Sequence, residues 1–341
     1  MNANHTLLIT GGTGSFGKAF LKNILALPQE SVPKRIIVFS RDEDKQFHQR
    51  QLLPDPRIEY FVGDIRDLDT LKKATKGVDT IIHAAALKQV PTGEFFPNEV
   101  VRTNVLGSHN VIEAAIANNV RKVVAISTDK AVAPLNAYGM SKAIAEKYFY
   151  AASADRNNQT KFVMVRYGNV MGSRGSVIPL FIKQIQEGLP LTITDGSMTR
   201  FLLKLDEAVG LVHHAILYGD TGELFIKKAP ACTVDSLIQA LELHYGKTLE
   251  KKIIGIRPGE KLHEVLLNED EVGRGSEVSS IEGGNLFKVS SIFNQGIVLS
   301  PEQLATFEKI QPKSLSALAS NTTRMLDAKE TLELIRGEKL L

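Results

Sequence analysis

The sequence predicts an α/β fold in which a doubly wound parallel sheet is joined to a smaller C-terminal lobe. Two observations carry this prediction. Short apolar runs alternate with helical patterns through the first half of the chain, which is the order expected of strand–helix–strand units. The runs at 7–9 and 36–39 are apolar at every position, and this is typical of parallel strands that are covered on both faces.

The alternation places the elements in order along the chain. Strands are predicted at 7–10, 35–39, 58–62, 80–83, 122–127 and 162–166, and the helices between them include 16–27, 43–52 and 136–152. After Gly168 the alternation weakens, and Gly and Pro residues interrupt it. We therefore expect one domain over residues 1–168, to which late strands return from the second half. Residues 169–341 are expected to form a substrate-binding lobe with a C-terminal extension.

Composition excludes several classes of protein. The 341 residues include 41 Lys and Arg against 38 Asp and Glu, and a net charge of +3 is too small to indicate binding to nucleic acid or to a membrane surface. No apolar run approaches the roughly 20 residues that cross a bilayer. The single cysteine, Cys232, cannot form an internal disulfide. We expect a soluble, cytoplasmic protein.

A glycine-rich turn from Thr10 to Gly17 directly follows the first predicted strand and opens the first helix. In this context Gly11 permits a tight turn, Gly14 lets the backbone approach a pyrophosphate, and Gly17 lets helix and strand pack closely. The helix N-terminus supplies N–H groups to the phosphates. The turn predicts a Rossmann-type dinucleotide site formed by Gly11, Thr13, Gly14, Ser15, Phe16 and Gly17.

The end of the second strand bears on which dinucleotide binds. Enzymes that use NAD usually place an acid there, whereas this chain has Ser40 and Arg41. A guanidinium group suits a 2′-phosphate, so NADP is predicted, with NAD as the alternative. Asp42 comes one residue late for the acid, and it is equally suited to cap the next helix.

Two later strand ends complete the predicted cofactor site. After the third strand, Asp64 is placed to bond the adenine amino group and Ile65 to pack on the adenine ring. After the fourth strand, the small residues Ala84, Ala85 and Ala86 leave room for the nicotinamide ribose.

Tyr138 and Lys142 lie four residues apart on a predicted helix, so they share one face. A tyrosine serves as an acid and base when a nearby cation lowers its pKa, and Lys142 is placed to do this. Thr128, at the end of the fifth strand, is placed to bond the same reacting oxygen. These residues predict an oxidoreductive step assisted by Tyr138.

At this point the chain resembles the extended short-chain dehydrogenase/reductase family. Within that family it is similar to the nucleotide-sugar 4,6-dehydratases that act on UDP-N-acetylglucosamine and feed surface polysaccharide pathways. The matching segments are 10–17, 39–43, 83–91, 127–131, 166–170, 172–179, 198–201 and 259–264. Tyr138 is a departure, because some close relatives that share the 87–91 loop have Met there.

The resemblance implies a reaction in which the cofactor ends as it began. Tyr138 takes the proton of the 4-hydroxyl while a hydride leaves carbon 4 for the nicotinamide. The ketone acidifies carbon 5, where Lys130 acts as the base, and Asp129 is the acid that protonates the departing 6-hydroxyl. The hydride then returns to carbon 6. The product is a UDP-2-acetamido-2,6-dideoxy-4-hexulose, and inversion at carbon 5 is expected.

The resemblance also implies a site for the UDP-sugar in the second half. Lys88 is expected near the sugar and the cofactor, Asn169 and Arg200 on the nucleotide-sugar, and Arg257 and Glu260 near the diphosphate and ribose. Arg174 is a further guanidinium that suits phosphate charge. No histidines stand at ligand spacing, so no metal site is expected. Similar enzymes form homo-oligomers, hexamers among them.

Three alternatives remain open. A UDP-sugar 4-epimerase and a dehydratase that retains configuration at carbon 5 would share the fold and most of the site. A non-catalytic dinucleotide-binding regulator would not need Thr128, Asp129, Lys130, Tyr138 and Lys142 together. An epimerase needs no acid at carbon 6, so Asp129 favours dehydration.

Overall fold

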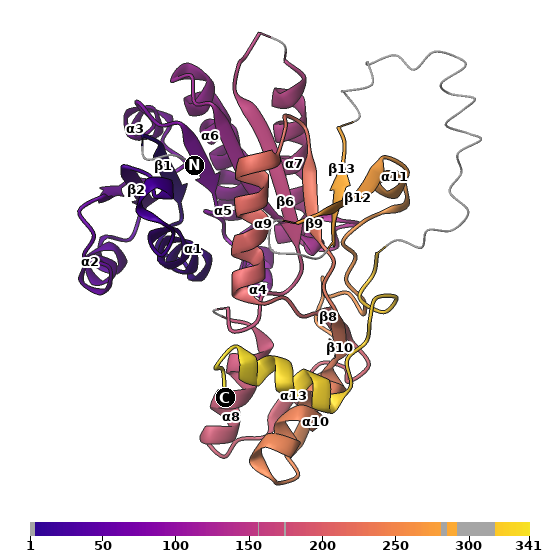
Figure 1. The fold of residues 1–341 in the computed structure, drawn as a ribbon. Coiled ribbons are helices and arrows are strands. Elements are labelled where there is room, and N and C mark those ends of the chain that lie inside the picture. Colours follow the sequence, from indigo (N-terminus) through magenta and orange to yellow (C-terminus); the bar gives the residue numbers. More distant parts are fainter. Residues whose placement is uncertain (1–3, 156, 174, 281–284, 292–317) are drawn as a thin grey trace, which may run out of the picture.

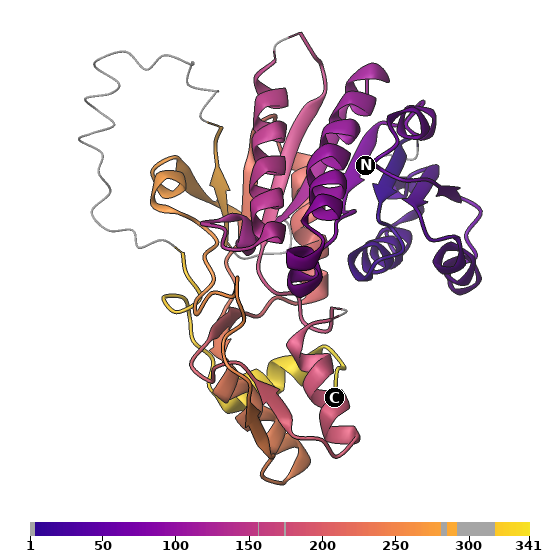
Figure 2. The same cartoon turned by 180° about the vertical axis from the view of Figure 1, so that it is seen from behind.

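The computed structural model of the protein describes residues 4–155, 157–173, 175–280, 285–291 and 318–341. It has an upper body built on a large sheet and a smaller lobe below it (Figure 1). The N-terminal half of the chain lies in the upper body, whereas the C-terminal helix packs in the lobe (Figures 1 and 2).

Among the described residues the large sheet has nine strands, in the order β12-β13-β9-β6-β5-β4-β1-β2-β3. Their bounds are β1 Thr6–Thr10, β2 Arg35–Ser40, β3 Ile58–Val62, β4 Thr80–His83, β5 Lys122–Thr128, β6 Lys161–Tyr167, β9 Leu224–Lys227, β12 Gly275–Ser279 and β13 Asn285–Val289. The seven strands β9, β6, β5, β4, β1, β2 and β3 pair in parallel, and β13 and β12 add an antiparallel edge. The predicted doubly wound, mainly parallel sheet is confirmed.

The direction in which the sheet grows reverses between β1 and β4, which are neighbours. From β1 the chain continues to β2 and β3 on one side, and from β4 it continues to β5 and β6 on the other. In open α/β sheets a ligand binds outside the carboxyl ends of the strands at such a reversal. The glycine turn after β1 and the loop after β4 therefore lie on either side of the expected cofactor position.

Successive residues of β1 explain why its run is apolar throughout. Leu8 belongs to one core cluster, whereas Leu7 and Ile9 belong to a second, and all three are fully buried. Helices cover both faces, with α1 and α9 in front of the sheet in Figure 1 and α6 and α7 on the face that Figure 2 shows. A strand buried on both faces gains from an apolar side chain at every position.

The helices of the upper body are α1 Ser15–Leu25, α2 Glu43–Leu52, α3 Leu68–Ala74, α4 Val90–Phe95, α5 Pro97–Val100, α6 Gly107–Ala117, α7 Ala137–Ala154 and α9 Leu205–Tyr218. The first ends two residues before the predicted Leu27, because the residue that precedes Pro28 is disfavoured in a helical conformation. Between α5 and α6 the chain takes a π-helical turn, Val101–Leu106.

The lobe has its own core, to which α8, α10 and the C-terminal helix contribute. Its elements are α8 Val177–Gln186, β7 Leu191–Ile193, β8 Thr199–Phe201, β10 Ala231–Thr233, α10 Val234–Tyr245, β11 Lys251–Ile253 and α13 Ala328–Gly337, and α11 Glu269–Gly273 lies beside the antiparallel edge of the sheet. Cys232 is buried in this core, and burial raises the pKa of its thiol to about 12. Within the described residues, no helix is both long and apolar enough to span a membrane.

Candidate active site

The glycine turn has the shape that a dinucleotide requires. Gly11 has a φ of 68°, and a Cβ there would lie 2.9 Å from the backbone of Ala85. A Cβ on Gly17 would lie 2.4 Å from the carbonyl oxygen of Gly12. Gly14 precedes α1 and has no side chain with which to cap the first turn, and that turn carries no acidic residue. The helix N-terminus is thus left to an external anion, as a pyrophosphate site requires.

Thr10 fixes the glycine turn to the loop after β4. Its hydroxyl accepts from the amides of Ala84 and Ala85, each at 3.2 Å, and lies 2.9 Å from Nδ1 of His83. Nε2 of His83 lies 3.0 Å from the Ser108 hydroxyl. Burial, aided by the charge of Lys142, lowers the pKa of His83 to about 3, so this imidazole stays neutral. The sequence analysis did not identify His83 as a residue that shapes the site.

The NADP prediction depends on two residues at the end of β2, Ser40 and Arg41. The Ser40 hydroxyl is buried and lies 3.0 Å from Nε2 of Gln46. The Arg41 side chain is 48% exposed, and its Nη1 lies 3.7 Å from Oδ2 of Asp64. Asp42 accepts from the amide of Lys45 at 2.9 Å and so caps α2, as the alternative for that residue predicted. Arg41 is therefore the exposed cation at this strand end.

The two residues predicted to contact adenine have protein partners. Asp64 accepts from Arg66 through both side-chain and backbone N–H groups, at 2.8 and 2.9 Å. Burial raises the pKa of Asp64, but its hydrogen bonds to Arg66 and the charges of Arg66 and Arg41 outweigh burial. The net pKa of Asp64 is therefore below its usual value. Ile65 is only 4% exposed, and it packs where a Cβ on Gly107 would lie 2.7 Å away. In this structure Ile65 is a core residue, and its packing on an adenine ring stays a prediction.

Lys142 and Tyr138 are both on α7, as predicted, but burial has a large effect on the pKa of each. Lys142 is buried, its Nζ donates to the carbonyl of Ile126 at 2.7 Å, and burial lowers its pKa to about 8. Burial also raises the pKa of Tyr138, although the charge of Lys130 and a hydrogen bond with Thr128 oppose the rise. The charge of Lys130 lowers the pKa of Tyr138, so Lys130 is a cation that stabilises a Tyr138 phenolate in this structure. Lys142 is bonded to the backbone instead.

Asp129 is the most deeply buried of the predicted catalytic residues, with no exposed surface. Its Oδ1 accepts from the Thr128 hydroxyl at 2.9 Å and from Nζ of Lys130 at 3.1 Å. Its Oδ2 is buried, and no described residue bonds it. Burial raises the pKa of Asp129, and the nearby Glu264 adds to the rise. The carboxyl group is thus suited to hold a proton and to pass it to a ligand through Oδ2.

Lys130 lies between two carboxylates, because its Nζ is 3.1 Å from Asp129 Oδ1 and 3.1 Å from Glu264 Oε1. Burial lowers the pKa of Lys130, but the charges of the two carboxylates outweigh it and the net shift is upward. Lys130 is therefore an ammonium group in this structure, and it must lose a proton before it acts as the predicted base.

Residues 257–264 of the lobe dock onto the loop from Thr128 to Asn136, which we name the catalytic loop. Nδ2 of Asn136 donates to the carbonyl of Gly259 at 2.8 Å, and Lys261 donates to the carbonyl of Val132. Gly259 has a φ of 81°, and a Cβ there would lie 2.9 Å from that of Asn136. Asn136, Lys261 and Glu264 were not predicted as members of the site, although Lys261 and Glu264 lie in the segment 259–264, which matches the family.

The predicted substrate residues face different surroundings. Oδ1 of Asn169 is buried, and no described residue bonds it, so this amide suits a ligand. Nη1 of Arg200 donates to the carbonyl of Thr199 at 2.8 Å, and its Nε lies 3.9 Å from Glu264. Arg257 and Glu260 pair with each other at 3.8 Å. The structure thus places Arg200 beside Lys130, through their shared partner Glu264.

The remaining predictions concern Lys88 and Arg174. Lys88 is exposed and follows Leu87, whose amide and carbonyl both bond the Asn104 side chain, at 2.8 and 2.9 Å. Asn104 also donates to the Ser141 hydroxyl at 2.9 Å, so the π-helical turn ties this loop to α7. No sequence signal had identified Asn104. Arg174 lies outside the described residues.

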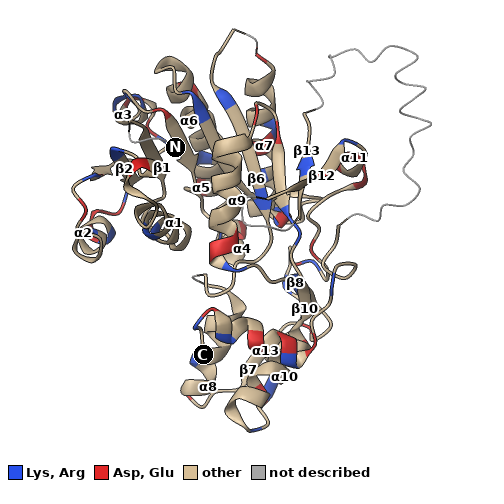
Figure 3. Ribbon diagram, in the orientation of Figure 1, with Lys and Arg blue, Asp and Glu red and all other residues tan. Residues whose placement is uncertain are grey.

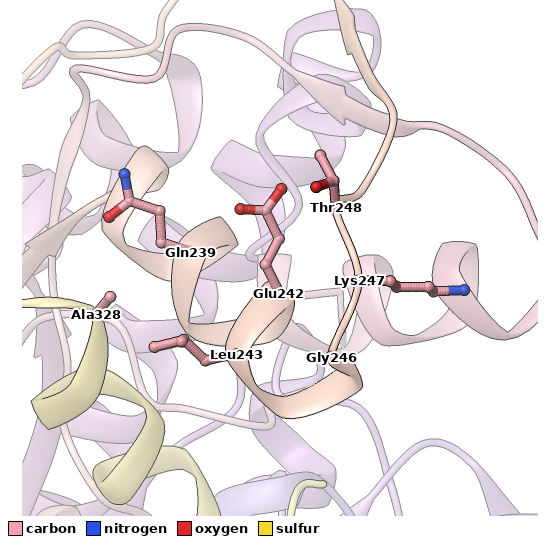
Figure 4. Close-up of a pocket in the computed structure, with 7 residues that line it drawn as sticks. All are labelled: Gln239, Glu242, Leu243, Gly246, Lys247, Thr248 and Ala328. Carbon is pink, nitrogen blue, oxygen red and sulfur yellow. The ribbon is translucent and has the colours of Figure 1, made fainter.

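Outside the candidate site, the described residues show interspersed charge and a hollow in the lobe. Acidic and basic residues are interspersed along the ribbon (Figure 3). Figure 4 shows a shallow hollow of the lobe beside α10, and none of the predicted site residues lines it. Within the described ranges, no group of three or more His, Cys, Asp or Glu side chains could hold a metal ion. The hollow beside α10 is lined by Gln239, Glu242, Leu243, Gly246, Lys247, Thr248 and Ala328.

Comparison with known proteins gives one family and consistent relatives. A family model described as "Polysaccharide biosynthesis protein" matches residues 7–283. A protein of Rickettsia bellii (strain RML369-C) named UDP-glucose 4-epimerase is 47% identical over 290 residues, which cover 85% of this chain and 84% of that protein. A protein of Rickettsia canadensis (strain McKiel) with the same name is 43% identical, and the match covers 98% of this chain and 96% of that one.

Solved structures extend the comparison to the fold. Pen from Bacillus thuringiensis superposes with a TM-score of 0.87 at 35% identity, and the match covers 99% of this chain and 100% of that chain. DesIV from Streptomyces venezuelae, a dTDP-glucose 4,6-dehydratase solved with NAD bound, gives a TM-score of 0.67 at 25% identity and covers 75% of this chain and 86% of its own.

Proposed function

Since this chain belongs to the polysaccharide biosynthesis protein family and is an enzyme of nucleotide-sugar metabolism, we propose that it is an NADP-dependent UDP-N-acetylglucosamine 4,6-dehydratase. One observation carries the proposal. The fully buried carboxyl group of Asp129 has one oxygen without a described partner, and its other oxygen is bonded to Lys130. An elimination needs an acid and a base in addition to the group that takes the 4-hydroxyl proton, and a reductase or a 4-epimerase does not.

The cofactor would be held by the glycine turn and by Arg41. The first turn of α1 has no side-chain cap, so its N–H groups can bind the pyrophosphate, and the exposed Arg41 lies at the end of β2, where a 2′-phosphate would come. When bound, the nicotinamide would supply the hydride acceptor for carbon 4 of the sugar and the hydride donor for carbon 6. Structural neighbours bind NAD, which is the alternative cofactor.

Tyr138 would take the proton of the 4-hydroxyl. Thr128 bonds both Tyr138 and Asp129, so these two proton-holding groups are joined through one hydroxyl. The positive charge of Lys130 favours the phenolate that Tyr138 needs to accept a proton. The proton received from the 4-hydroxyl can thus replace the one that Asp129 later gives up.

One proton transfer would convert the Asp129–Lys130 pair into the acid and base of elimination. If the ammonium of Lys130 gives its proton to Asp129 along their 3.1 Å hydrogen bond, the products are a free amine and a carboxylic acid. The amine takes the proton of carbon 5, and Asp129 protonates the 6-hydroxyl so that the carbon–oxygen bond breaks and water leaves. Carbon 5 regains a proton as the hydride reaches carbon 6; return from Lys130 gives retention, and delivery from the opposite face of the sugar gives the expected inversion.

A UDP-sugar 4-epimerase is the second candidate, and the names of the curated relatives favour it over dehydration. The relatives that are 43–48% identical are named UDP-glucose 4-epimerase. An epimerase would use Tyr138 and the cofactor in the same way and would then return the hydride to carbon 4 on the other face. It would leave the buried acid Asp129 without a part in the reaction.

Incubation in deuterated water distinguishes the two candidates. UDP-N-acetylglucosamine and UDP-glucose are each supplied with the enzyme and NADP, and the products are analysed by mass spectrometry and NMR. Loss of one water with deuterium at carbon 5 is the result expected of the dehydratase, and ring couplings report inversion or retention there. An unchanged mass with a 4-epimeric product would establish the epimerase and overturn the dehydratase.

Substitution of Arg41 tests the cofactor. In Arg41→Ala we expect NADP to bind about tenfold more weakly or worse, since a hydrogen bond to a charged group contributes roughly 1.5–3 kcal/mol, while NAD binds as before. Dissociation constants for both dinucleotides are measured by titration calorimetry. Arg121→Ala removes the same charge from a side chain that is 75% exposed and serves as the control. Equal losses for NADP and NAD would argue against a 2′-phosphate contact.

A further inference from the structure

Glu264 is a buried carboxylate from the lobe that lies within the catalytic pair. Its side chain is 4% exposed, and its Oε1 lies 3.1 Å from Nζ of Lys130. Its backbone is fixed on both sides by Ser320, whose hydroxyl accepts from the Glu264 amide at 2.9 Å and whose amide donates to the Glu264 carbonyl at 2.8 Å. The carboxylate is thus held rigidly against the catalytic loop.

The two carboxylates that share Lys130 differ in their other neighbours. Glu264 has two further cations, with Arg200 Nε at 3.9 Å from Oε1 and Lys261 Nζ at 4.0 Å from Oε2. Besides Lys130, Asp129 has only the neutral Thr128 hydroxyl. The second oxygen of each carboxyl group lacks a hydrogen-bond partner among the described residues, but that of Glu264 lies near the Lys261 cation. A single ammonium group cannot neutralise both carboxylates, so the one with more cations keeps its charge and the other is the better place for a proton.

The direction of the pKa shifts agrees with this geometry. Burial raises the pKa of both carboxyl groups, but Lys130, Arg200 and Lys261 together bring the pKa of Glu264 below its usual value. The pKa of Asp129 stays above its usual value, and the charge of Glu264 contributes to that rise. Two neighbouring acids whose proton affinities are pushed apart are typical of an acid and a permanently charged partner.

We propose that Glu264 is a positioning residue that binds the Lys130 ammonium group and thereby leaves Asp129 to hold the proton it donates. The inference rests on the proposed dehydration, because only that reaction uses Asp129 as an acid. Glu264 acts through Lys130, so it sets the pH range over which the acid is protonated.

The test is the pH dependence of water loss in Glu264→Gln. The groups that face Asp129 and Lys130 are Glu264, Arg200, Lys261 and Tyr138. The charge of Glu264 raises the pKa of Asp129, so removing it lets Asp129 lose its proton at a lower pH. We expect the alkaline limb of the rate of water loss to move to lower pH by about one unit, as for other charges removed within a few ångströms.

Two variants serve as matched controls. Glu264→Asp keeps the charge and should leave the alkaline limb near its wild-type position. Glu269→Gln removes a charge from an exposed residue at the start of α11 and should not move it. If Glu264→Gln does not fold, Lys261→Met provides the opposite test. Losing this cation strengthens the hold of Glu264 on Lys130 and removes a positive charge from Asp129, so the limb should move to higher pH.

The outcomes separate this inference from the proposed function. If the wild-type enzyme loses no water from UDP-N-acetylglucosamine, both the proposed function and the role of Glu264 are overturned. If the wild-type enzyme loses water but the alkaline limb is the same in Glu264→Gln, or if Glu264→Asp moves it as far as Glu264→Gln does, the role of Glu264 alone is overturned. A lower rate at every pH without a shift of the limb would also refute it.

Discussion

Replacing Asp129 with Asn is expected to slow the loss of water by about 10²–10⁴-fold, which is the usual contribution of a positioned acid. Asn has nearly the same shape as Asp, so the bonds that Oδ1 accepts from Thr128 and Lys130 can be kept. The amide has no proton of suitable acidity to give to the 6-hydroxyl. Oxidation at carbon 4 uses Tyr138 and should therefore continue.

The measurement must separate oxidation from elimination. In Asp129→Asn, the near-ultraviolet absorbance of reduced nicotinamide should appear when substrate is added, while mass spectrometry finds little product that has lost water. Asp206→Asn removes a carboxylate from an exposed position on α9 and is the matched control. If Asp129→Asn loses water at a rate close to that of the wild type, Asp129 is not the acid of the elimination, and another group must protonate the 6-hydroxyl.

The parts of the structure that the sequence predicted well depend on local patterns. The continuous apolar run of β1 requires cover on both faces, and the sheet supplies it through two core clusters. The glycine turn was identified from the spacing of its glycines. In the structure Gly11 and Gly17 each lie where a Cβ would meet backbone atoms, which explains that spacing. Short-range geometry of this kind is encoded by residues that are neighbours in the chain.

The electrostatics of the site could not be predicted in the same way. Helical spacing correctly placed Tyr138 and Lys142 on one helix, but the degree of burial decided the sign of the pKa shift of Tyr138. Lys130 is charged because Glu264 approaches it from the lobe, and this contact joins segments that are far apart in the sequence. Contacts of this kind depend on how the lobe docks onto the sheet, and no local pattern records that.

A second buried network is centred on Arg166 of β6, and it fixes α7, the helix that carries Tyr138 and Lys142. Arg166 is 1% exposed, and it donates to Glu146 of α7 at 3.1 and 2.7 Å and to Glu271 of α11 at 2.8 and 2.7 Å. A fifth bond, of 2.8 Å, reaches the carbonyl of Leu266. Ser127, which precedes Thr128, donates to Glu146. The Arg166 guanidinium group thus joins the sheet, α7 and the segment that follows Glu264.

Arg166→Met is expected to lower the free energy of unfolding by about 3–5 kcal/mol, because it leaves the two buried carboxylates without their cation. Unfolding in urea, followed by circular dichroism, measures the loss. Arg35→Met is the matched control, since Arg35 bonds Glu59 at similar distances of 2.8 and 2.7 Å while its side chain is 39% exposed. An exposed pair contributes about 0–1 kcal/mol, so this variant should remain close to the wild type.

The comparison also tests how the network acts. If burial makes Arg166 important, the triple variant Arg166→Met, Glu146→Gln, Glu271→Gln should recover much of the stability that Arg166→Met loses, because its uncompensated charges are gone. A loss of less than about 1 kcal/mol in Arg166→Met would instead place this network with ordinary surface ion pairs. Recovery of stability without recovery of activity would show that the network orients α7, on which Tyr138 and Lys142 stand, in addition to holding the fold together.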